Sequence, residues 1–462
     1  ILDELRDSSS TFYGDSKVRR VGSQGELVKI QINHYSSLVR NLVSLVTNNR
    51  PAWSPISANS DADSQSASIL ASGLLDYYMK EHRLERVFKN ATLAATFLKE
   101  AFVTVTWDVT KGEIVHPGDE QNLPLHEGDL DFRLYLLNDV IRDVNKLDSS
   151  LDWCITREWK NRFEIASQFP EYAEQIISIQ EESLDKFRIN ISQESNNNKF
   201  NKVDNDLIPF YTFYYKKSAI LPNGRQVNFV KDIVLTDSPL AYSKIPLVKI
   251  SSEDKFDSCF SHSPMLDILP LQKGINALAS SILSNNQAFG VQNIWSKKGN
   301  GLTVSQLAGG LNLIESEEMP QPLQLTASSS ETYKFLEMLV QQSQLISGIN
   351  DAIRGQTSAG QSGAALALLS QQAIQFANGL QQSYVSLVED VGTLSIQILQ
   401  RYANTKRVSI ITGKHNQPLL KEWSAQNDYK ECSFTIKENL FFSNQKPITI
   451  EDDQNSFKRS AY

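Results

Sequence analysis

Residues 331–402 constrain the fold most, because they read as a helix, a loop containing glycine and serine, and a second, very long helix. Apolar or small residues of the second helix recur at steps that alternate strictly between three and four, which is a heptad pattern. Residues 363–402 span about 60 Å as a helix, a length that suits a part bracing something extended. The seam consists of Leu366, Ser370, Ala373, Ala377, Leu380, Tyr384, Leu387, Val391, Leu394 and Ile398.

Two glycines, Gly379 and Gly392, lie inside this long helix. Each costs about 1 kcal/mol relative to alanine in a helix interior. Either they allow another element to approach the helix closely, or they mark a kink.

The composition predicts a folded chain that does not grip nucleic acid over a broad basic face. Of the 462 residues, 40% are hydrophobic and 21% are charged, and the net charge is −8. That charge opposes phosphate binding, although DNA can still pass such a protein. Cys154, Cys259 and Cys432 are too far apart for a metal motif and do not suggest a disulfide framework, which favours a reducing, cytosolic setting. No apolar run reaches about 18 residues, so no membrane-spanning helix is expected.

Sequence motifs for catalysis are absent. The chain has no G-x-x-x-x-G-K-[ST], G-x-S-x-G or H-E-x-x-H. Gly22 and Gly25 read as a turn rather than a phosphate cradle, and the six histidines are scattered. Loop carboxylates such as Asp61 and Asp63 are better read as solvated than as metal ligands. We therefore expect no enzymatic activity, no metal and no cofactor.

Hydrophobic periodicity predicts an α+β, helix-rich protein. The expected helices span 27–49, 66–100, 162–180, 264–292, 331–349 and 363–402. β-Branched and aromatic runs predict strands at 102–107, 132–136, 153–157, 208–215, 227–235, 408–412 and 432–437. Asn223-Gly224 is a turn signal between two of these strands. The composition of the polar segment 190–206 predicts a mobile loop.

Several short motifs follow one another in a fixed order along the chain. They are Asn48-Asn49-Arg50-Pro51, Trp107-Asp108, Leu137–Asp143, Trp153, Ile245–Val248, Ser263-Pro264, Leu271–Leu278, Ser347–Asn350, Arg354-Gly355 and Ser362–Ala365. In this order they resemble the portal proteins of tailed bacteriophages, especially the portal family of short-tailed phages. Each motif alone is unspecific, and the resemblance rests on their succession over some 400 residues.

The resemblance implies a portal-type fold with an α/β wing, two stem helices, a clip, a tunnel loop and a long wing helix. The implied boundaries are 1–263 for the wing, 264–292 and 331–349 for the stem helices, 293–330 for the clip, 350–362 for the tunnel loop, 363–404 for the long wing helix, 405–450 for wing strands and 451–462 for the start of a C-terminal crown. Either the rest of a crown lies beyond this sequence, or the protein lacks it.

The same resemblance implies a non-enzymatic ring of twelve subunits at the unique capsid vertex, assembled in the host cytoplasm and retained in the virion. Double-stranded DNA would pass through its channel during packaging and ejection. Implied partners are the terminase large subunit, the major capsid and scaffolding proteins, and head–tail adaptor or tail proteins. Twelve copies of −8 carry about −96, so an acidic bore would let DNA slide. The alternatives are another ring-forming virion protein, such as a head–tail adaptor or tail hub, and a nucleic-acid-processing enzyme.

Candidate site residues follow from the implied parts. The DNA-facing tunnel loop would contain Asn350, Asp351, Arg354, Gly355, Gln356, Thr357, Ser358 and Gly360. The clip, which meets partners, would contain Trp295, Lys297, Lys298, Glu315, Glu317 and Glu318. The stem would contain Gln272, Lys273 and Asn276, on the polar side of its helix, which in a ring faces the channel or solvent. Arg354 either contacts phosphates or pairs with Asp351 or a neighbouring subunit. Trp295 either packs internally or contacts a partner.

Overall fold

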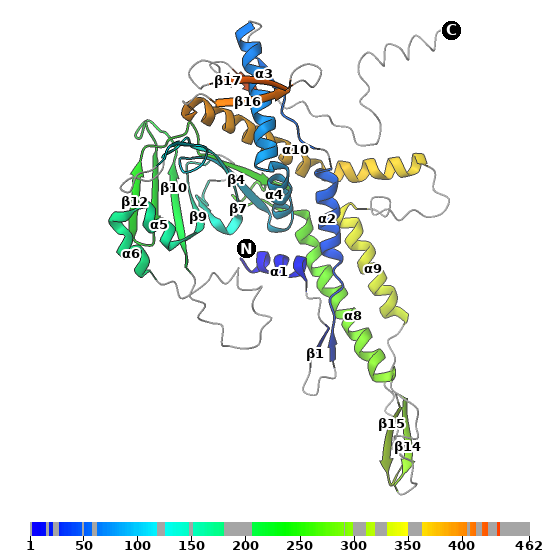
Figure 1. Ribbon diagram of the computed structural model, residues 1–462. Coiled ribbons are helices and arrows are strands. Elements are labelled where there is room, and N and C mark those ends of the chain that lie inside the picture. Colours follow the sequence, from blue (N-terminus) through cyan, green and yellow to red (C-terminus); the bar gives the residue numbers. More distant parts are fainter. Residues whose placement is uncertain are drawn as a thin grey trace, which may run out of the picture. The chain divides into compact units, whose positions relative to one another are not determined.

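The computed structural model shows a mixed α+β protein in which about half of the described residues are helical (Figure 1). The described residues are 2–14, 18–21, 27–48, 50–57, 62–117, 125–146, 151–179, 206–290, 292–298, 311–318, 330–349, 363–403, 407–412, 418–423 and 432–434. They belong to two compact units. The first unit comprises Ile1–Leu42 and Pro264–Gln361, and the second comprises Val43–Ser263 and Ser362–Tyr462.

Two helices, α8 (Leu269–Gly290) and α9 (Ser330–Ser347), lie side by side in the first unit (Figure 1). A 3-10 helix, η3 (Pro264–Ile268), precedes α8. Gly274 lets α9 approach α8 closely, because a Cβ added there would lie only 3.3 Å from Cδ1 of Leu339. A bulkier residue at this position would therefore push the two helices apart.

The chain between α8 and α9 forms a pair of parallel strands, β14 (Gln292–Lys297) and β15 (Leu311–Ser316). Trp295 of β14 is in register with Ile314 of β15. Figure 1 shows the pair beyond the adjoining ends of the two helices. The unit therefore carries a small projection at one end of its helix pair.

The N-terminal segment of the first unit lies along α8. It contains α1 (Leu2–Tyr13), the antiparallel strands β1 (Arg19–Val21) and β2 (Leu27–Lys29), and the start of α2 (His34–Val46). Tyr35 is fully buried, and its hydroxyl lies 2.9 Å from Oγ of Ser8. This contact joins α1 to α2, and burial raises the pKa of the Tyr35 phenol despite the hydrogen bond from Ser8.

An antiparallel sheet of five strands, in the order β12-β11-β10-β9-β8, lies in the second unit. Its strands are β8 (Val140–Arg142), β9 (Trp153–Asn161), β10 (Leu207–Tyr215), β11 (Arg225–Val230) and β12 (Ile233–Ser238). Helices α5 (Arg162–Gln168) and α6 (Ala173–Ser178) pack around one hydrophobic cluster with it, and η2 (Pro170–Tyr172) connects them. The buried members of that cluster are Ile165, Ala166, Ile176, Ile208, Phe210, Val230 and Leu235.

A second sheet in this unit has three antiparallel strands in the order β13-β4-β7. These are β13 (Leu247–Ser251), β4 (Glu100–Asp108) and β7 (Asp129–Leu136), and η1 (Leu137–Asp139) follows β7. Helix α4 (Leu84–Leu98) packs against β4, which is buried from its first residue to Val105. Helix α3 (Ala62–Glu81) precedes α4. Two-stranded sheets pair β3 (Pro55–Ser57) with β18 (Cys432–Phe434), β5 (Ile114–His116) with β6 (Leu125–His126), and β16 (Arg407–Thr412) with β17 (Pro418–Trp423).

The 40-residue helix α10 (Gly363–Tyr402) also belongs to the second unit. The seam residues from Ala377 to Ile398 are all buried, as the heptad pattern predicts for a packed stripe. A Cβ at Gly392 would lie 2.6 Å from Nε1 of Trp53, and one at Gly379 would lie 3.1 Å from the Ser252 carbonyl oxygen. The glycines therefore permit close approach, the first of the two readings that the sequence left open.

Most predicted elements are confirmed, and the departures have physical reasons. The expected helix over 66–100 is two helices, because Arg83 adopts a left-handed conformation with φ of 49°. The helix expected over 27–49 begins only at His34, since residues 27–29 form a strand. The expected strand over 227–235 is two strands, which turn at Lys231 with φ of 52°. The segment 190–205 lies outside the described residues.

Candidate functional site

A stripe of polar side chains on α8 binds the extended segment that leads into α2. Its four members, spaced four residues apart, are Gln272, Asn276, Ser280 and Ser284. Because four residues of helix rise about 6 Å and two residues of strand about 6.6 Å, such a stripe can pair with alternate residues of an extended chain. The contacts of Ser284, Ser280 and Asn276 with Val28, Ile30 and Ile32 have this arrangement, whereas Gln272 contacts Ile32 and Tyr35.

Each serine hydroxyl accepts from one backbone amide of the segment, and its single proton lies closest to the helix carbonyl oxygen four residues earlier, at 2.6 Å for Ser280 and 2.8 Å for Ser284. Ser284 Oγ accepts from the Val28 amide at 2.8 Å and lies 3.3 Å from the Val28 carbonyl oxygen. Ser280 Oγ makes the same two contacts with Ile30, at 3.1 and 3.2 Å. The helix side chains thus satisfy backbone groups that a neighbouring strand would otherwise satisfy.

The longer side chains extend the stripe toward the start of α2. Asn276 Oδ1 accepts from the Ile32 amide at 3.1 Å. Gln272 Nε2 donates to the Ile32 carbonyl oxygen at 2.6 Å, and its Oε1 accepts from the Tyr35 amide at 2.9 Å. Gln272 therefore satisfies an amide in the first turn of α2, where no helical partner exists.

The stem candidates consequently differ from one another. Gln272 is 0% exposed, so the expectation that its side chain faces the channel or solvent does not hold within the subunit. Asn276 is half-buried and occupied by the N-terminal segment. Lys273 is exposed and pairs with Asp7 of α1 at 2.7 Å. The amphipathic pattern identified a polar face but not its partner.

Clip candidates lie on or beside the two parallel strands. Trp295 Nε1 donates to Ser316 Oγ at 2.8 Å, which ties β14 to the end of β15. Lys297, Lys298, Glu317 and Glu318 are exposed, and Glu315 is in register with Ser296. The strand ends therefore present charges of both signs close to one another. All tunnel-loop candidates, from Asn350 to Gly360, lie outside the described residues.

Large apolar side chains on α9 remain exposed within the subunit. Phe335, Met338 and Leu345 follow one another at steps of three and seven, and Tyr333 is also exposed. Their exposed fractions range from 44% to 73%. Steps of three and seven place the first three on one side of the helix. Exposed apolar side chains that lie on one side of a helix are a candidate contact surface for another chain.

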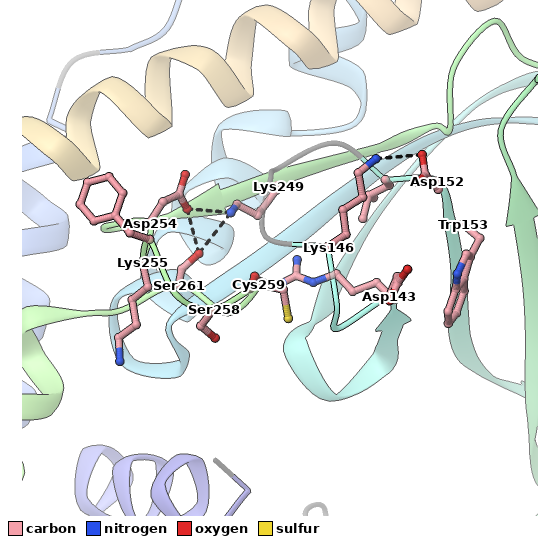
Figure 2. Close-up of a pocket in the computed structure, with 13 residues that line it drawn as sticks. Asp143, Lys146, Asp152, Trp153, Lys249, Asp254, Lys255, Ser258, Cys259 and Ser261 are labelled. Atoms are coloured by element: carbon pink, nitrogen blue, oxygen red, sulfur yellow. Dashed lines mark hydrogen bonds and ion pairs between the residues drawn. The ribbon is translucent and has the colours of Figure 1, made fainter.

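A cavity of about 410 Å³ lies in the second unit beside the ends of β8 and β13 (Figure 2). Arg142 lines it and is buried, with its guanidinium 5.2 Å from the Phe102 ring centroid and 5.5 Å from that of Phe260. Its Nη2 donates to Glu100 Oε1 at 2.5 Å and to the Cys259 carbonyl oxygen at 2.6 Å. This buried ion pair fixes the loop that contains Cys259 onto the sheet.

Two further ion pairs line this cavity. Lys249 contacts Asp254 at 2.7 Å, and Lys146 contacts Asp152 at 2.8 Å. Nearby Cys154 is not a nucleophile, because burial raises its pKa to about 12. Among the described residues no group of three or more His, Cys, Asp or Glu could hold a metal ion. The ion pairs around the cavity connect the loop that follows β13 to the neighbouring strands.

The architecture places a projecting strand pair between two adjacent helices and a 40-residue helix after them. The family model for phage P22-like portal proteins matches residues 15–436, which is most of the chain. The chain belongs to this portal family. A search of curated proteins finds no match. Among the described residues, no helix is long and apolar enough to cross a membrane.

Membership explains the absence of catalytic motifs, because portal proteins are structural and non-enzymatic components of the bacteriophage virion. The family also implies an oligomeric ring. Sequence reasoning found the family, the long helix and the polar side of α8, but not that this side binds the N-terminal segment. The four-residue spacing from Gln272 to Ser284 was the available signal.

Proposed function

We propose that this protein forms the portal ring at the unique capsid vertex and is the channel for DNA packaging and ejection. The match over residues 15–436 carries the proposal. The helix pair α8–α9, with β14 and β15 at one end, supports it. The parts keep the boundaries stated above, with the stem helices at 264–292 and 331–349 and the clip at 293–330.

Ring formation through the stem is supported by the two outer surfaces of the first unit. Phe335, Met338 and Leu345 present bulky apolar groups on α9, whereas α8 exposes the small side chains Ala277 and Ser281. Large side chains of one copy can fill the shallow surface left by small ones of the next. Two different surfaces that contact each other from copy to copy generate a closed ring when the rotation closes, and we propose twelve copies.

The negative net charge of the subunit favours a channel through which DNA slides over a protein that binds DNA phosphates tightly. Each subunit carries −8, so a ring repels phosphates from most of its wall. The tunnel-loop residues 350–362 would then touch DNA locally through Arg354. The exposed charges at Lys297, Lys298, Glu317 and Glu318 would dock the terminase large subunit and later the adaptor or tail proteins. Capsid and scaffolding proteins would meet the outer surface of the ring.

Electron microscopy of the purified protein tests the ring, with twelve-fold particles expected. Monomers at every concentration and in every preparation would refute the proposal.

The DNA contact is tested by Arg354→Ala, with Arg354→Lys as the matched control that keeps the positive charge. The alanine variant should assemble normally but package or retain less DNA, and the lysine variant should do better. Normal packaging by Arg354→Ala would remove Arg354 from the DNA-facing role.

A further inference from the structure

Phe256 is fully exposed at the tip of a loop that follows β13. Its neighbours Lys255 and Asp257 are exposed as well. Its ring borders the 410 Å³ cavity described above and is left in water, although phenylalanine is normally withdrawn from it. The ring makes no ring contact or cation–π contact with the described part of its own chain. Its chemistry suits insertion into an apolar cavity of a partner.

The loop that presents Phe256 is held at its base. Glu253 and His262 form an antiparallel bridge, with backbone hydrogen bonds of 3.1 and 2.8 Å. Asp254 Oδ1 accepts from Lys249 Nζ at 2.7 Å and from Ser261 Oγ at 3.0 Å, as Figure 2 shows. A tip on such a base loses little conformational freedom on binding, which favours affinity.

The second unit also contains a cavity of about 340 Å³ that suits an aromatic ring. Its apolar lining comes from Ala241, Tyr242, Leu394, Ile398 and Tyr402. A benzene ring already fits a cavity of about 150 Å³, so this one has room for a phenyl group and the adjoining backbone. The cavity is shaped by side chains of α10 and of the segment before β13.

Internal contacts fix the walls of this cavity. The Tyr402 hydroxyl donates to the Ala241 carbonyl oxygen at 2.9 Å, and the Tyr242 hydroxyl accepts from the Trp107 amide at 3.1 Å. The two tyrosine rings meet edge to face with centroids 6.3 Å apart. Because both hydroxyls have partners, the rings are oriented before any ligand arrives. An edge-to-face contact with a third ring is then favourable.

Charge selects a second copy of this chain as the occupant. Arg401 is exposed and lines the cavity, and Asp257 directly follows Phe256. Insertion of Phe256 would therefore bring the Asp257 carboxylate close to the Arg401 guanidinium at the edge of the cavity. We propose that the Phe256 loop of one subunit inserts into the tyrosine-lined cavity of its neighbour in the ring. This inference rests on the proposed ring.

The Phe256 loop and the tyrosine-lined cavity are different surfaces of the same unit, so the contact between two copies is heterologous. Contacts of this type pass from copy to copy in one direction and close into a ring when the rotation allows it. This contact would connect second units, whereas the α9 stripe connects first units. Each of the two can be removed separately.

Sedimentation velocity over a concentration series tests the contact through four variants. Phe256→Ser should raise the concentration for half-assembly by about tenfold or more, because a central aromatic anchor is lost. Asp257→Arg and Arg401→Asp should each weaken assembly, and the variant with both changes should recover most of it. Ile220→Ser, which removes another exposed apolar side chain of the same unit, is the matched control and should assemble like wild type.

A photocrosslinker at position 256 identifies the occupant directly. The expected product joins position 256 of one subunit to a peptide containing residues 394–402 of another. Crosslinks only to a different virion protein, or Phe256→Ser rings that assemble like wild type, would overturn this contact while leaving the portal ring standing. Wild-type protein that never assembles would overturn both.

Discussion

Replacing Gln272 with methionine should detach the N-terminal segment from α8. Methionine keeps the length and approximate volume of the side chain and removes its donor and acceptor. The buried Tyr35 amide then loses its partner, whereas the Ile32 carbonyl oxygen still accepts from the His34 amide at 2.9 Å. One orphaned buried amide costs about 1–3 kcal/mol, so the local free energy of opening should fall by about 1–3 kcal/mol.

Hydrogen exchange measured by mass spectrometry is the appropriate assay, because a multi-unit ring protein need not unfold in two states. Exchange of the peptide covering 28–36 should accelerate by about 5-fold to 140-fold, since 1.4 kcal/mol is a factor of ten. Gln287→Met, an exposed change on the same helix, is the control and should leave this peptide unaffected. Acceleration below about threefold, or equal in both variants, would refute the role of Gln272 in holding the segment.

Three further changes test the second unit. Gly392→Ala should destabilise the fold by about 1–3 kcal/mol in thermal unfolding, because its Cβ would collide with the Trp53 ring. Cys154 should resist alkylation at pH 8 while half-buried Cys259 reacts, as peptide mapping would show, since the raised pKa keeps the Cys154 thiol protonated. Burial raises the pKa of Asp131, but two cationic partners outweigh it and hold the pKa below its usual value. Its stabilisation should therefore be complete above about pH 5 and lost on further acidification, and Asp131→Asn should remove this dependence in pH-dependent unfolding curves.

Local patterns predicted those elements whose cause is local. The seam of α10 follows from heptad spacing, and its buried part confirms the pattern. Strand β4 follows from its β-branched and aromatic run. Arg83 breaks the helix expected over 66–100 without glycine or proline, because packing of α3 and α4 overrides local helical preference. The tunnel-loop residues came from family resemblance alone.

Strand β2 and its contacts on α8 depended on a partner about 250 positions away in sequence. For residues 27–29, helical spacing in the following residues favoured extending the helix, yet Val28 pairs its backbone with Ser284 instead. No window of a few dozen residues contains both partners. For the same reason Gln272 read as solvent-facing, since burial of a polar side chain requires a partner that only the tertiary structure supplies.

The order of side chains along the α8 stripe still contains information. A helix advances about 6 Å per four residues and a strand about 6.6 Å per two, so the pairing drifts by about 2 Å over three steps. The stripe compensates by length, with serine at 284 and 280, asparagine at 276 and glutamine at 272. Short hydroxyls reach the backbone where the two chains are closest, and the longest amide reaches the start of α2. On α8 the longest side chain therefore lies where the pairing with alternate residues ends, at the start of α2.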